Sequence, residues 1–439
     1  MSERPSVATH RVARWAFLLA VFTYGLVGLG SAQTSPVVAV NHGPNTAAQQ
    51  KKHYVILVSM DGLRYDYAER YNATNLQAMA SGGASAPDGM IPSYPSVTFP
   101  NHYTLVTGLY PEHHGIVGNI FYDPARKEVY SYHDPATVDD GTWYGGTPLW
   151  VLAEQHGMRA ACFFWPASEA EIQGVRPSYY VKYDDHYPNA KRVEQVLNWL
   201  RLPAPERPHF ITLYFSDADD AGHKYGPDST QVADAVQELD AEVGALEAGI
   251  KQLKLPVDVI VVADHGMATI QGGWIDLDQN GLDVSLLEKI EGFFLYPKSE
   301  EAAEQVFMGM EGASDKFRVF RRKEVPSNLH FDSNPREGDP VVVAAGPYAI
   351  RAVSDESDPK PAAGNHGFNP MLVPEMKATF IAGGPDIRAG ARIAPFENVD
   401  VYPFIAKILG LDITSLKTGS IDGSLASLQP ALRGPQAHK

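Results

Sequence analysis

Residues 53–62 read HYVILVSMDG, an unbroken apolar run that ends in an acidic residue and a glycine. The run does not alternate between apolar and polar side chains, which is typical of a strand buried on both faces of a sheet. Four more segments contain runs of this kind: RAACFFWP (159–166), HFITLYFSDAD (209–219), VDVIVVADHG (257–266) and KATFIAGGP (377–385). The sequence therefore predicts a central sheet of mostly parallel strands.

Helical patterns separate these runs along the chain. They cover NLQAMASGG (75–83), PLWVLAEQHG (148–157), KRVEQVLNWL (191–200), QVADAVQELDAEVGALEAGIKQL (231–253) and VDVYPFIAKILGL (399–411). Strands that alternate with helices predict an α/β fold with helices on both faces of the sheet. Residues 273–355 depart from this rhythm, because several strand patterns surround one helical pattern there. We interpret this stretch as a small α+β insertion.

The two ends of the chain differ from the middle in composition. Arginines precede the apolar run WAFLLAVFTYGLVGL (15–29), and small residues follow it, which is the order of a secretory signal. The run is shorter than the ~20 residues that span a bilayer. We therefore expect a cleaved signal peptide, with an uncleaved anchor as the alternative, in a periplasmic or secreted protein. The expected parts are a signal over 1–32, a linker over 33–52, one large domain over 53–425 and a flexible tail over 426–439.

Charge and cysteine content exclude several classes of protein. Asp and Glu outnumber Lys and Arg by 52 to 36, a formal net charge of −16. Such a chain has no broad attraction for nucleic-acid polymers or anionic membrane surfaces, so any phosphate that it handles needs a local source of positive charge. The one cysteine, Cys162, rules out an internal disulfide and is interpreted as a core residue.

Carboxylates and imidazoles gather where the predicted strands end. Six candidates lie directly after strands or in glycine-rich loops: Asp61, Asp219, His223, Asp264, His265 and His366. Each one alone is more often part of a turn or a surface pair. Ligands of open parallel sheets, however, bind beyond the carboxyl ends of the strands. Three Asp and three His suit zinc, and six ligands fit two ions better than one tetrahedral ion.

The segment YPSVTFPNHYTLVTG (94–108) has two interpretations. Thr98 is a normal N-cap residue, proline is favoured in the first helical turn, and Gly108 is typical of a helix end. A threonine at a helix N-terminus also lies where main-chain N–H groups and the helix dipole favour an anion. Two metals would clamp a phosphate there, and Thr98 held as an alkoxide would be a nucleophile.

Five motifs occur in an order that resembles a known family. They are SMDGLRYDY (59–67), SYPSVTFPNHYTLVTGLYPEHHGIVGN (93–119), DADDAGHKYGP (217–227), VVADHGM (261–267) and GNHGFNP (364–370). Over residues 53–425 the chain resembles the nucleotide pyrophosphatase/phosphodiesterases of the alkaline phosphatase superfamily, specifically their compact bacterial members. The resemblance implies an alkaline-phosphatase-like catalytic domain with two zinc ions.

The resemblance also implies a metal role for seven residues, including Thr98 as the nucleophile. One zinc would be held by Asp61, Thr98, Asp264 and His265. The other zinc would be held by Asp219, His223 and His366. Many relatives have Glu-Pro before the metal-binding aspartate, whereas this chain has SDADDAGH, so Asp217 and Asp220 are rival carboxylates. The spacing to His223 favours Asp219.

Four further residues match substrate-binding positions of that family. The Asn119 amide would donate to a phosphate oxygen, Phe99 and Tyr183 would hold a nucleobase between their rings, and Tyr214 would lie near the phosphoryl group. A buried helix-start aromatic is an equally good interpretation of Phe99, and Tyr183 lies among several tyrosines.

The implied reaction is hydrolysis of phosphodiester and pyrophosphate bonds in nucleotides through a nucleotidyl-threonine intermediate. NTPs, dinucleotides and nucleotide diesters would be the substrates, and an NTP would give NMP and pyrophosphate. A phosphodiesterase for lysophospholipid-type or other non-nucleotide diesters and a phosphomonoesterase are alternatives on the same scaffold. A non-catalytic binding protein with a vestigial metal site is the alternative from a different class.

Overall fold

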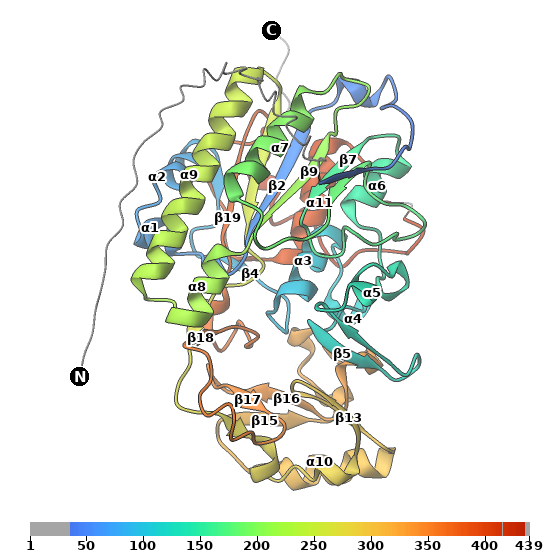
Figure 1. Ribbon diagram of the computed structural model, residues 1–439, viewed down its shortest axis with the longest axis vertical. Helices are drawn as coiled ribbons and strands as arrows, with labels where there is room; N and C mark the ends of the chain where they lie inside the picture. The colour runs from blue at the N-terminus through green and yellow to red at the C-terminus, as the bar shows by residue number, and fades with distance from the viewer. Residues whose placement is uncertain (1–35, 415, 435–439) are drawn as a thin grey trace, which may run out of the picture. The chain divides into compact units, whose positions relative to one another are not determined.

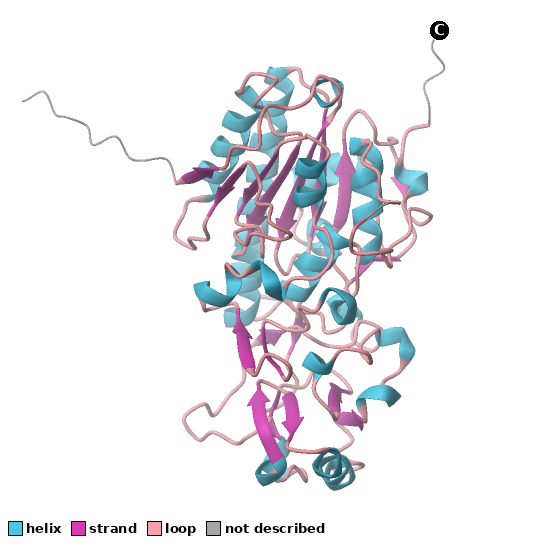
Figure 2. Cartoon of the chain, turned by 90° about the vertical axis from the view of Figure 1, so that its right-hand side faces the viewer, coloured by secondary structure: helices cyan, strands magenta, loops and turns pink. Residues whose placement is uncertain are grey.

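The computed structural model describes residues 36–414 and 416–434. A sheet of nine strands forms its centre, in the order β1–β8–β7–β9–β2–β10–β19–β3–β20 (Figures 1 and 2). The bounds are β1 Val37–Ala39, β8 Tyr179–Val181, β7 Ala160–Phe163, β9 Phe210–Phe215, β2 Tyr54–Met60, β10 Val257–Val262, β19 Phe380–Gly383, β3 Ala84–Ser85 and β20 Ala391–Arg392. All five apolar runs form strands of this sheet, which confirms the predicted α/β fold.

The first apolar run forms β2 in the middle of the sheet. β2 pairs in parallel with β9 and with β10, so Leu57 lies opposite Thr212 on one side and Ile260 on the other. Every residue of β2 is buried. β19 runs antiparallel to β10, which makes the sheet mixed. The carboxyl ends of β2, β9 and β10 therefore lie at the same edge of the sheet, where open α/β sheets bind their ligands.

Helices cover both faces of the sheet (Figures 1 and 2). One layer contains α2 (Thr74–Gly82), α7 (Asn189–Arg201) and α9 (Thr230–Leu253). The other contains α3 (Thr98–Thr107), α6 (Leu149–Gln155) and α11 (Val401–Leu409). All five predicted helical segments are helices. The two layers bury the apolar faces of the sheet, as the continuous apolar strands require.

Residues 275–352 form the insertion, at the bottom of Figure 1. It consists of α10 (Glu300–Met310) and of strand pairs β12 (Ile275–Asp276) with β17 (Ile350–Arg351), β13 (Leu287–Glu291) with β14 (Phe294–Pro297), and β15 (Phe317–Phe320) with β16 (Val341–Ala344). An apolar cluster of its own fills it, with Leu277, Val306 and Met310 at the centre. The insertion is therefore packed on two sides, by this cluster and by side chains such as Phe294 and Val343 that join the main core.

The structure differs from the sequence-based expectation at both ends of the domain. Residues 37–52, expected in a linker, belong to the fold, because β1 pairs with β8 and Asn45 is buried. The tail expected from residue 426 is packed as far as 434, since Leu428 is buried and Leu432 bridges to Ile387. Amide and main-chain hydrogen bonds hold the first segment, whereas Leu428, Ala431 and Leu432 of the second pack into the main core. Both segments are too short for a periodic apolar pattern in the sequence.

The predicted signal peptide over 1–32 lies outside the described residues. Within the described ranges, no helix has the length and apolar character to cross a membrane. Cys162 is buried in β7, as expected of a core residue, and burial raises the pKa of its thiol.

We expect Asn45→Ala to lower the free energy of unfolding by about 2–4 kcal/mol, because buried polar groups lose their partners. The Asn45 amide donates to the carbonyl oxygens of Ala204 at 2.9 Å and Arg207 at 2.7 Å, and its Oδ1 accepts from the Arg159 N–H at 2.7 Å. Urea unfolding measures the loss. Asn41→Ala, at an exposed position of the same segment, is the control. Equal losses in the two variants would contradict the docking of this segment.

Candidate active site

The sheet edge where β2, β9 and β10 end carries the three predicted aspartates. Asp61 follows β2 directly, and Asp264 lies two residues beyond the end of β10. Asp219 lies in the first turn of α8 (Asp217–Tyr225), which begins just after β9. A Cβ atom at Gly62, whose φ is +67°, would lie 2.9 Å from the Asp219 Cα atom. Glycine is therefore required where the β2 loop meets α8.

The three predicted histidines share one arrangement of hydrogen bonds. Each places Nδ1 at 2.9–3.0 Å from a main-chain carbonyl oxygen: His223 at Gly364, His265 at Gly266 and His366 at Ser96. A neutral imidazole that donates from Nδ1 keeps a lone pair on Nε2. Metal-binding histidines typically use their second ring nitrogen in this way.

One centre lies around the Nε2 atom of His265. This atom is 2.9 Å from Asp264 Oδ2, 3.5 Å from Asp61 Oδ1 and 3.4 Å from Thr98 Oγ1. All four ligands predicted for the first zinc therefore meet here. His265 and both aspartates are buried.

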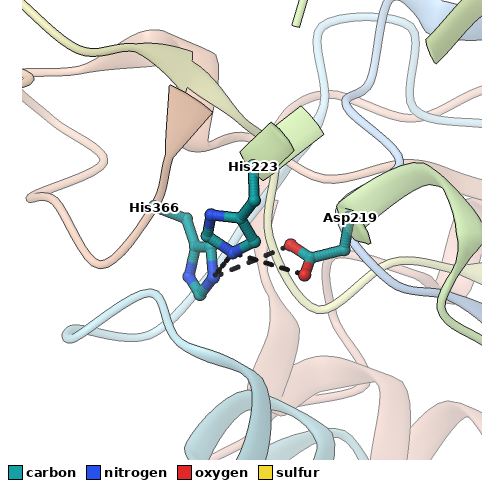
Figure 3. Close-up of side chains that lie close together, drawn as sticks. All are labelled: Asp219, His223 and His366. Atoms are coloured by element: carbon teal, nitrogen blue, oxygen red, sulfur yellow. Dashed lines mark hydrogen bonds and ion pairs between the residues drawn. The ribbon is translucent and has the colours of Figure 1, made fainter. Parts of the chain in front are cut away.

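A second centre joins α8 to the loop after β18 (Gly364–Asn365) (Figure 3). The Nε2 atoms of His223 and His366 lie 3.1 Å apart, and they are 3.4 Å from Asp219 Oδ2 and 3.7 Å from Asp219 Oδ1, respectively. Two imidazole lone pairs repel at this separation unless a proton or a cation lies between them. These are the three ligands predicted for the second zinc.

Unpaired carboxylate oxygens test whether the site fits metal ions. Among the candidate ligands in the described residues, three buried carboxylate oxygens have no hydrogen-bond partner: Asp61 Oδ1, Asp219 Oδ1 and Asp264 Oδ2. A buried carboxylate oxygen without a donor is costly and requires an explanation. In the described part of the chain, ligand atoms of Asp219, His223 and His366, and likewise of Asp61, Asp219 and His265, lie within 4.8 Å of one another. The oxygen and nitrogen donors fit divalent cations such as zinc.

Thr98 is the first residue of α3 and not its N-cap. Val97 occupies the cap position with an extended backbone, and no side chain caps the helix. Gly108 ends the helix with φ +67°, as expected. The Thr98 hydroxyl therefore does not serve the capping role that its position suggests, and it faces His265 instead.

His102 belongs to the site but was not a candidate in the sequence analysis. It is fully buried one helical turn after Thr98, and its Nδ1 lies 2.9 Å from the Thr98 carbonyl oxygen. The same atom is 3.4 Å from Asp264 Oδ2, while Nε2 lies 2.7 Å from Ser59 Oγ. His102 thus links α3 to Asp264. Its four-residue spacing from Thr98 is the only sequence signal, and a buried core histidine shows the same signal.

Asn119 fixes the start of α3. Its Oδ1 accepts a hydrogen bond from the Phe99 N–H at 2.9 Å, so its Nδ2 keeps both protons for another acceptor.

The Phe99 ring is half-buried, and its centroid lies 6.2 Å from that of Tyr130 and 5.6 Å from that of Tyr132. Phe99 is therefore neither fully in the core nor fully exposed. Tyr132, which is 40% exposed, is a second aromatic residue that the sequence analysis did not select.

Tyr183 and Tyr214 form a second aromatic group. Tyr183 is 50% exposed, and its ring lies 5.3 Å from Phe164 and 6.1 Å from Tyr214. Tyr214 is buried and donates its hydroxyl proton to Asp61 Oδ2 at 2.7 Å. Tyr214 therefore orients a carboxylate of the first centre.

Burial and neighbouring charges raise the pKa of some of these groups and lower the pKa of others. Burial, and then the charge of Asp264, raise the pKa of Asp61 well above its ordinary value. Burial alone would also raise the pKa of Asp264, but the imidazoles of His265 and His102 lower it below its usual range. Burial and His265 lower the pKa of His366 to about 3, so this imidazole is neutral at pH 7.

The rival residues lie outside both centres. Asp217 Oδ1 accepts from the Asn189 amide at 2.8 Å, and Asp220 belongs to none of the ligand groups found in the described ranges. Two other histidines, His113 and His114, also have partners outside the centres. His114 is buried with Nε2 at 3.0 Å from the Thr104 hydroxyl, and His113 Nδ1 lies 2.7 Å from Asp422 Oδ2. Asp219 is therefore the carboxylate that α8 contributes.

Comparison with known proteins agrees with this geometry. The profile of the family described as type I phosphodiesterase / nucleotide pyrophosphatase matches residues 55–369. The chain belongs to this family. It is a hydrolase of the nucleotide pyrophosphatase/phosphodiesterase type, within the alkaline phosphatase superfamily.

Two relatives show how far the family likeness extends. A pyrophosphatase/phosphodiesterase of Schizosaccharomyces pombe is 33% identical over 392 residues, 84% of this chain and 79% of the relative. Ectonucleotide pyrophosphatase/phosphodiesterase family member 1 of Rattus norvegicus is 33% identical over 384 residues, 84% of this chain but 42% of the relative. The chain thus spans most of the yeast relative and less than half of the rat one.

Solved structures of the family share the fold. Murine ectonucleotide pyrophosphatase/phosphodiesterase 5 superposes with a TM-score of 0.80 at 28% identity, covering 87% of this chain and 100% of the murine chain. An inactive threonine-to-alanine variant of the murine protein, in complex with AMP, superposes equally well.

We expect His366→Ala to lose about one bound divalent cation per chain, because each centre needs three to four protein ligands. Elemental analysis after dialysis measures the cation content. His156→Ala is the control, since His156 is exposed and belongs to none of the candidate ligand groups in the described ranges. Cation loss from wild type should also grow as the pH falls, because protons compete for the ligands. Unchanged cation content in His366→Ala would show that this residue is not a ligand.

Proposed function

We propose that the protein hydrolyses phosphodiester and pyrophosphate bonds of nucleotides and releases a nucleoside 5′-monophosphate. The observation that carries the proposal is the Thr98 hydroxyl, which lies at a helix N-terminus 3.4 Å from the Nε2 atom of a buried histidine–aspartate centre. A related structure that holds AMP supports a nucleotide as the substrate. The inactive threonine variant of that relative supports a threonine nucleophile.

Two zinc ions fit the two centres. Asp61, Thr98, Asp264 and His265 would hold one ion, and Asp219, His223 and His366 the other. When bound, such ions lower the pKa of a hydroxyl or water and neutralise the charge of phosphate oxygens. The local positive charge that an acidic chain needs would then be present.

The protein groups around Thr98 position the phosphate. The N-terminal end of the α3 dipole attracts its negative charge, and the Asn119 Nδ2 protons are available to a non-bridging oxygen. Thr98 Oγ1 then forms a bond to phosphorus while the bond to the leaving oxygen breaks. Water cleaves the resulting nucleotidyl-threonine, and two in-line displacements give net retention at phosphorus.

Aromatic rings provide the site for the base. Phe99 follows the nucleophile directly, so its ring lies near the scissile phosphate. Tyr132 lies beside Phe99, and Tyr183 packs on Tyr214, which itself contacts Asp61. Stacking accepts every base, because each has a π face. We therefore propose a broad nucleotide specificity in a protein exported by the signal at 1–32.

Thr98→Ala should abolish turnover and keep the fold and the zinc content near normal, because the remaining ligands stay in place. Thr98→Ser should retain part of the activity, since it keeps the hydroxyl. Release of 4-nitrophenol from thymidine 5′-(4-nitrophenyl) phosphate measures turnover. A Thr98→Ala rate above a few per cent of wild type would exclude the threonine nucleophile. A faster reaction with the monoester 4-nitrophenyl phosphate would instead indicate a phosphomonoesterase.

Phe99→Ala should raise KM for nucleotide substrates about ten- to a hundredfold, since stacking contributes ~1–3 kcal/mol per base. Bis(4-nitrophenyl) phosphate has no nucleobase and is the matched substrate. Its KM should change much less, apart from any disturbance of the helix start. Steady-state kinetics on both substrates test this. Equal losses on both would argue against base stacking and in favour of lipids or other non-nucleotide diesters.

A further inference from the structure

A cavity of about 310 Å³ lies between the second centre and the insertion. Its polar end is formed by Asn119, His223, Asn365 and His366. Its other end is apolar and comes mostly from the insertion: Tyr94, Phe293, Val342, Ala344, Tyr348, Ile350 and Phe368. The volume is at the lower end of the ~300–1,000 Å³ of small-molecule sites. A molecule that fills it would have one polar end and one apolar end.

The walls of the cavity are fixed by the secondary structure of the insertion. Ile350 lies in β17, which pairs with β12, and Val342 lies in β16, which pairs with β15. The Tyr94 hydroxyl reaches the Val342 carbonyl oxygen at 3.5 Å. Phe293, Tyr348 and Ile350 are only half-buried, so each has surface left for a bound group. The apolar side of the cavity is thus formed by side chains that the strands of the insertion already hold in place.

No lysine, arginine, aspartate or glutamate is among the residues that line this cavity in the described ranges. Lys316 is exposed, with its Nζ 5.6 Å from the centre of the Tyr348 ring, and it does not line the cavity. A highly charged group such as pyrophosphate would gain no ion pair from the insertion. An uncharged aromatic or aliphatic group would be stabilised there, because its apolar surface would leave water and pack against apolar side chains.

The position of the cavity identifies the side of the substrate that it faces. Thr98 lies beside His265 of the first centre, whereas the cavity is lined by His223 and His366 of the second. In an in-line displacement the leaving oxygen departs on the side opposite the nucleophile. Phe99, Tyr132 and Tyr183, which surround the proposed base site, do not line the cavity. The base and the leaving group therefore have different sites.

We infer that this cavity is the subsite for the leaving group and that it selects uncharged alcohols with an aromatic or aliphatic part, such as aryl alcohols or a second nucleoside. The inference rests on the proposed function and narrows it: diesters with such leaving groups are better substrates than nucleoside triphosphates. The leaving oxygen keeps the electron pair of the broken P–O bond and takes up a proton from solvent, while Thr98 Oγ1, having lost its hydroxyl proton, forms the new P–O bond. The apolar part of the released alcohol stays against the Tyr348 and Ile350 side chains until the alcohol departs.

The test compares thymidine 5′-(4-nitrophenyl) phosphate with thymidine triphosphate, which share the nucleoside and differ in the leaving group. Ile350→Lys places a cation in the apolar wall. We expect kcat/KM for the aryl ester to fall about tenfold or more, since apolar contact is lost, and kcat/KM for the triphosphate to stay equal or to rise. Each variant is compared with wild type on the same substrate, so the difference in leaving-group reactivity cancels.

Two further variants keep the test decisive. Tyr348→Ala truncates another wall residue without adding charge and should also impair the aryl ester selectively. Val353→Lys adds the same charge as Ile350→Lys at an exposed position just after the insertion, outside the cavity, and should change the kinetics of neither substrate. Thermal unfolding and cation content verify that each variant is folded.

The possible outcomes distinguish a failure of the leaving-group subsite from a failure of the proposed function. Equal effects on both substrates, or none, in folded Ile350→Lys and Tyr348→Ala would overturn the leaving-group subsite while leaving the nucleotide hydrolase intact. If wild type, loaded with zinc, turned over neither substrate, the proposed function itself would fail. A selective loss on the aryl ester in both wall variants, but not in Val353→Lys, would support the subsite.

Discussion

The site depends on three imidazole rings whose Nδ1 atoms are all engaged by main-chain carbonyl groups. The carbonyls belong to Ser96, Gly266 and Gly364, in three loops that are far apart in the sequence. Each bond fixes the tautomer and the direction of a ring, so three Nε2 lone pairs converge on a few ångströms of space. The fold has to hold these loops in register, because a small displacement of any one would disperse the lone pairs.

The central sheet provides that register. Asp61 and Asp264 are carried on β2 and β10, which are neighbours and buried along their whole length. A buried carboxylate is costly to leave unpaired, and three of the site's carboxylate oxygens have no donor in the protein. The tightly packed sheet holds these groups where isolated charges would otherwise turn toward water. Cation binding would then relieve an arrangement that the fold has already imposed.

Sequence patterns predicted the fold and selected the six Asp and His residues that the structure brings together, because both leave local signals. Continuous apolar runs mark buried strands, and polar residues directly after them mark the sheet edge. Other features leave no such signal. His102 looks like any core histidine on a helix, and the docking of Asn45 depends on amide contacts with residues more than a hundred positions away. Threonine is a common N-cap residue, yet Thr98 lies one position inside the helix.

The insertion and the central sheet carry different parts of the site. The insertion forms most of the cavity wall, whereas the sheet edge and α8 carry the aspartates. Val342, Tyr348 and Ile350 pack in an apolar cluster separate from the main core, although neighbouring Val341 and Val343 join that core. The strands of the insertion pair with one another rather than with the central sheet. Substitutions in the cavity-facing positions of the insertion therefore need not move β2, β10 or α8, which position the aspartates of the two centres. The ligands are constrained by buried charge, whereas Tyr348 and Ile350 are constrained only by packing, which tolerates changes of similar volume. One constant centre is thus compatible with different leaving groups.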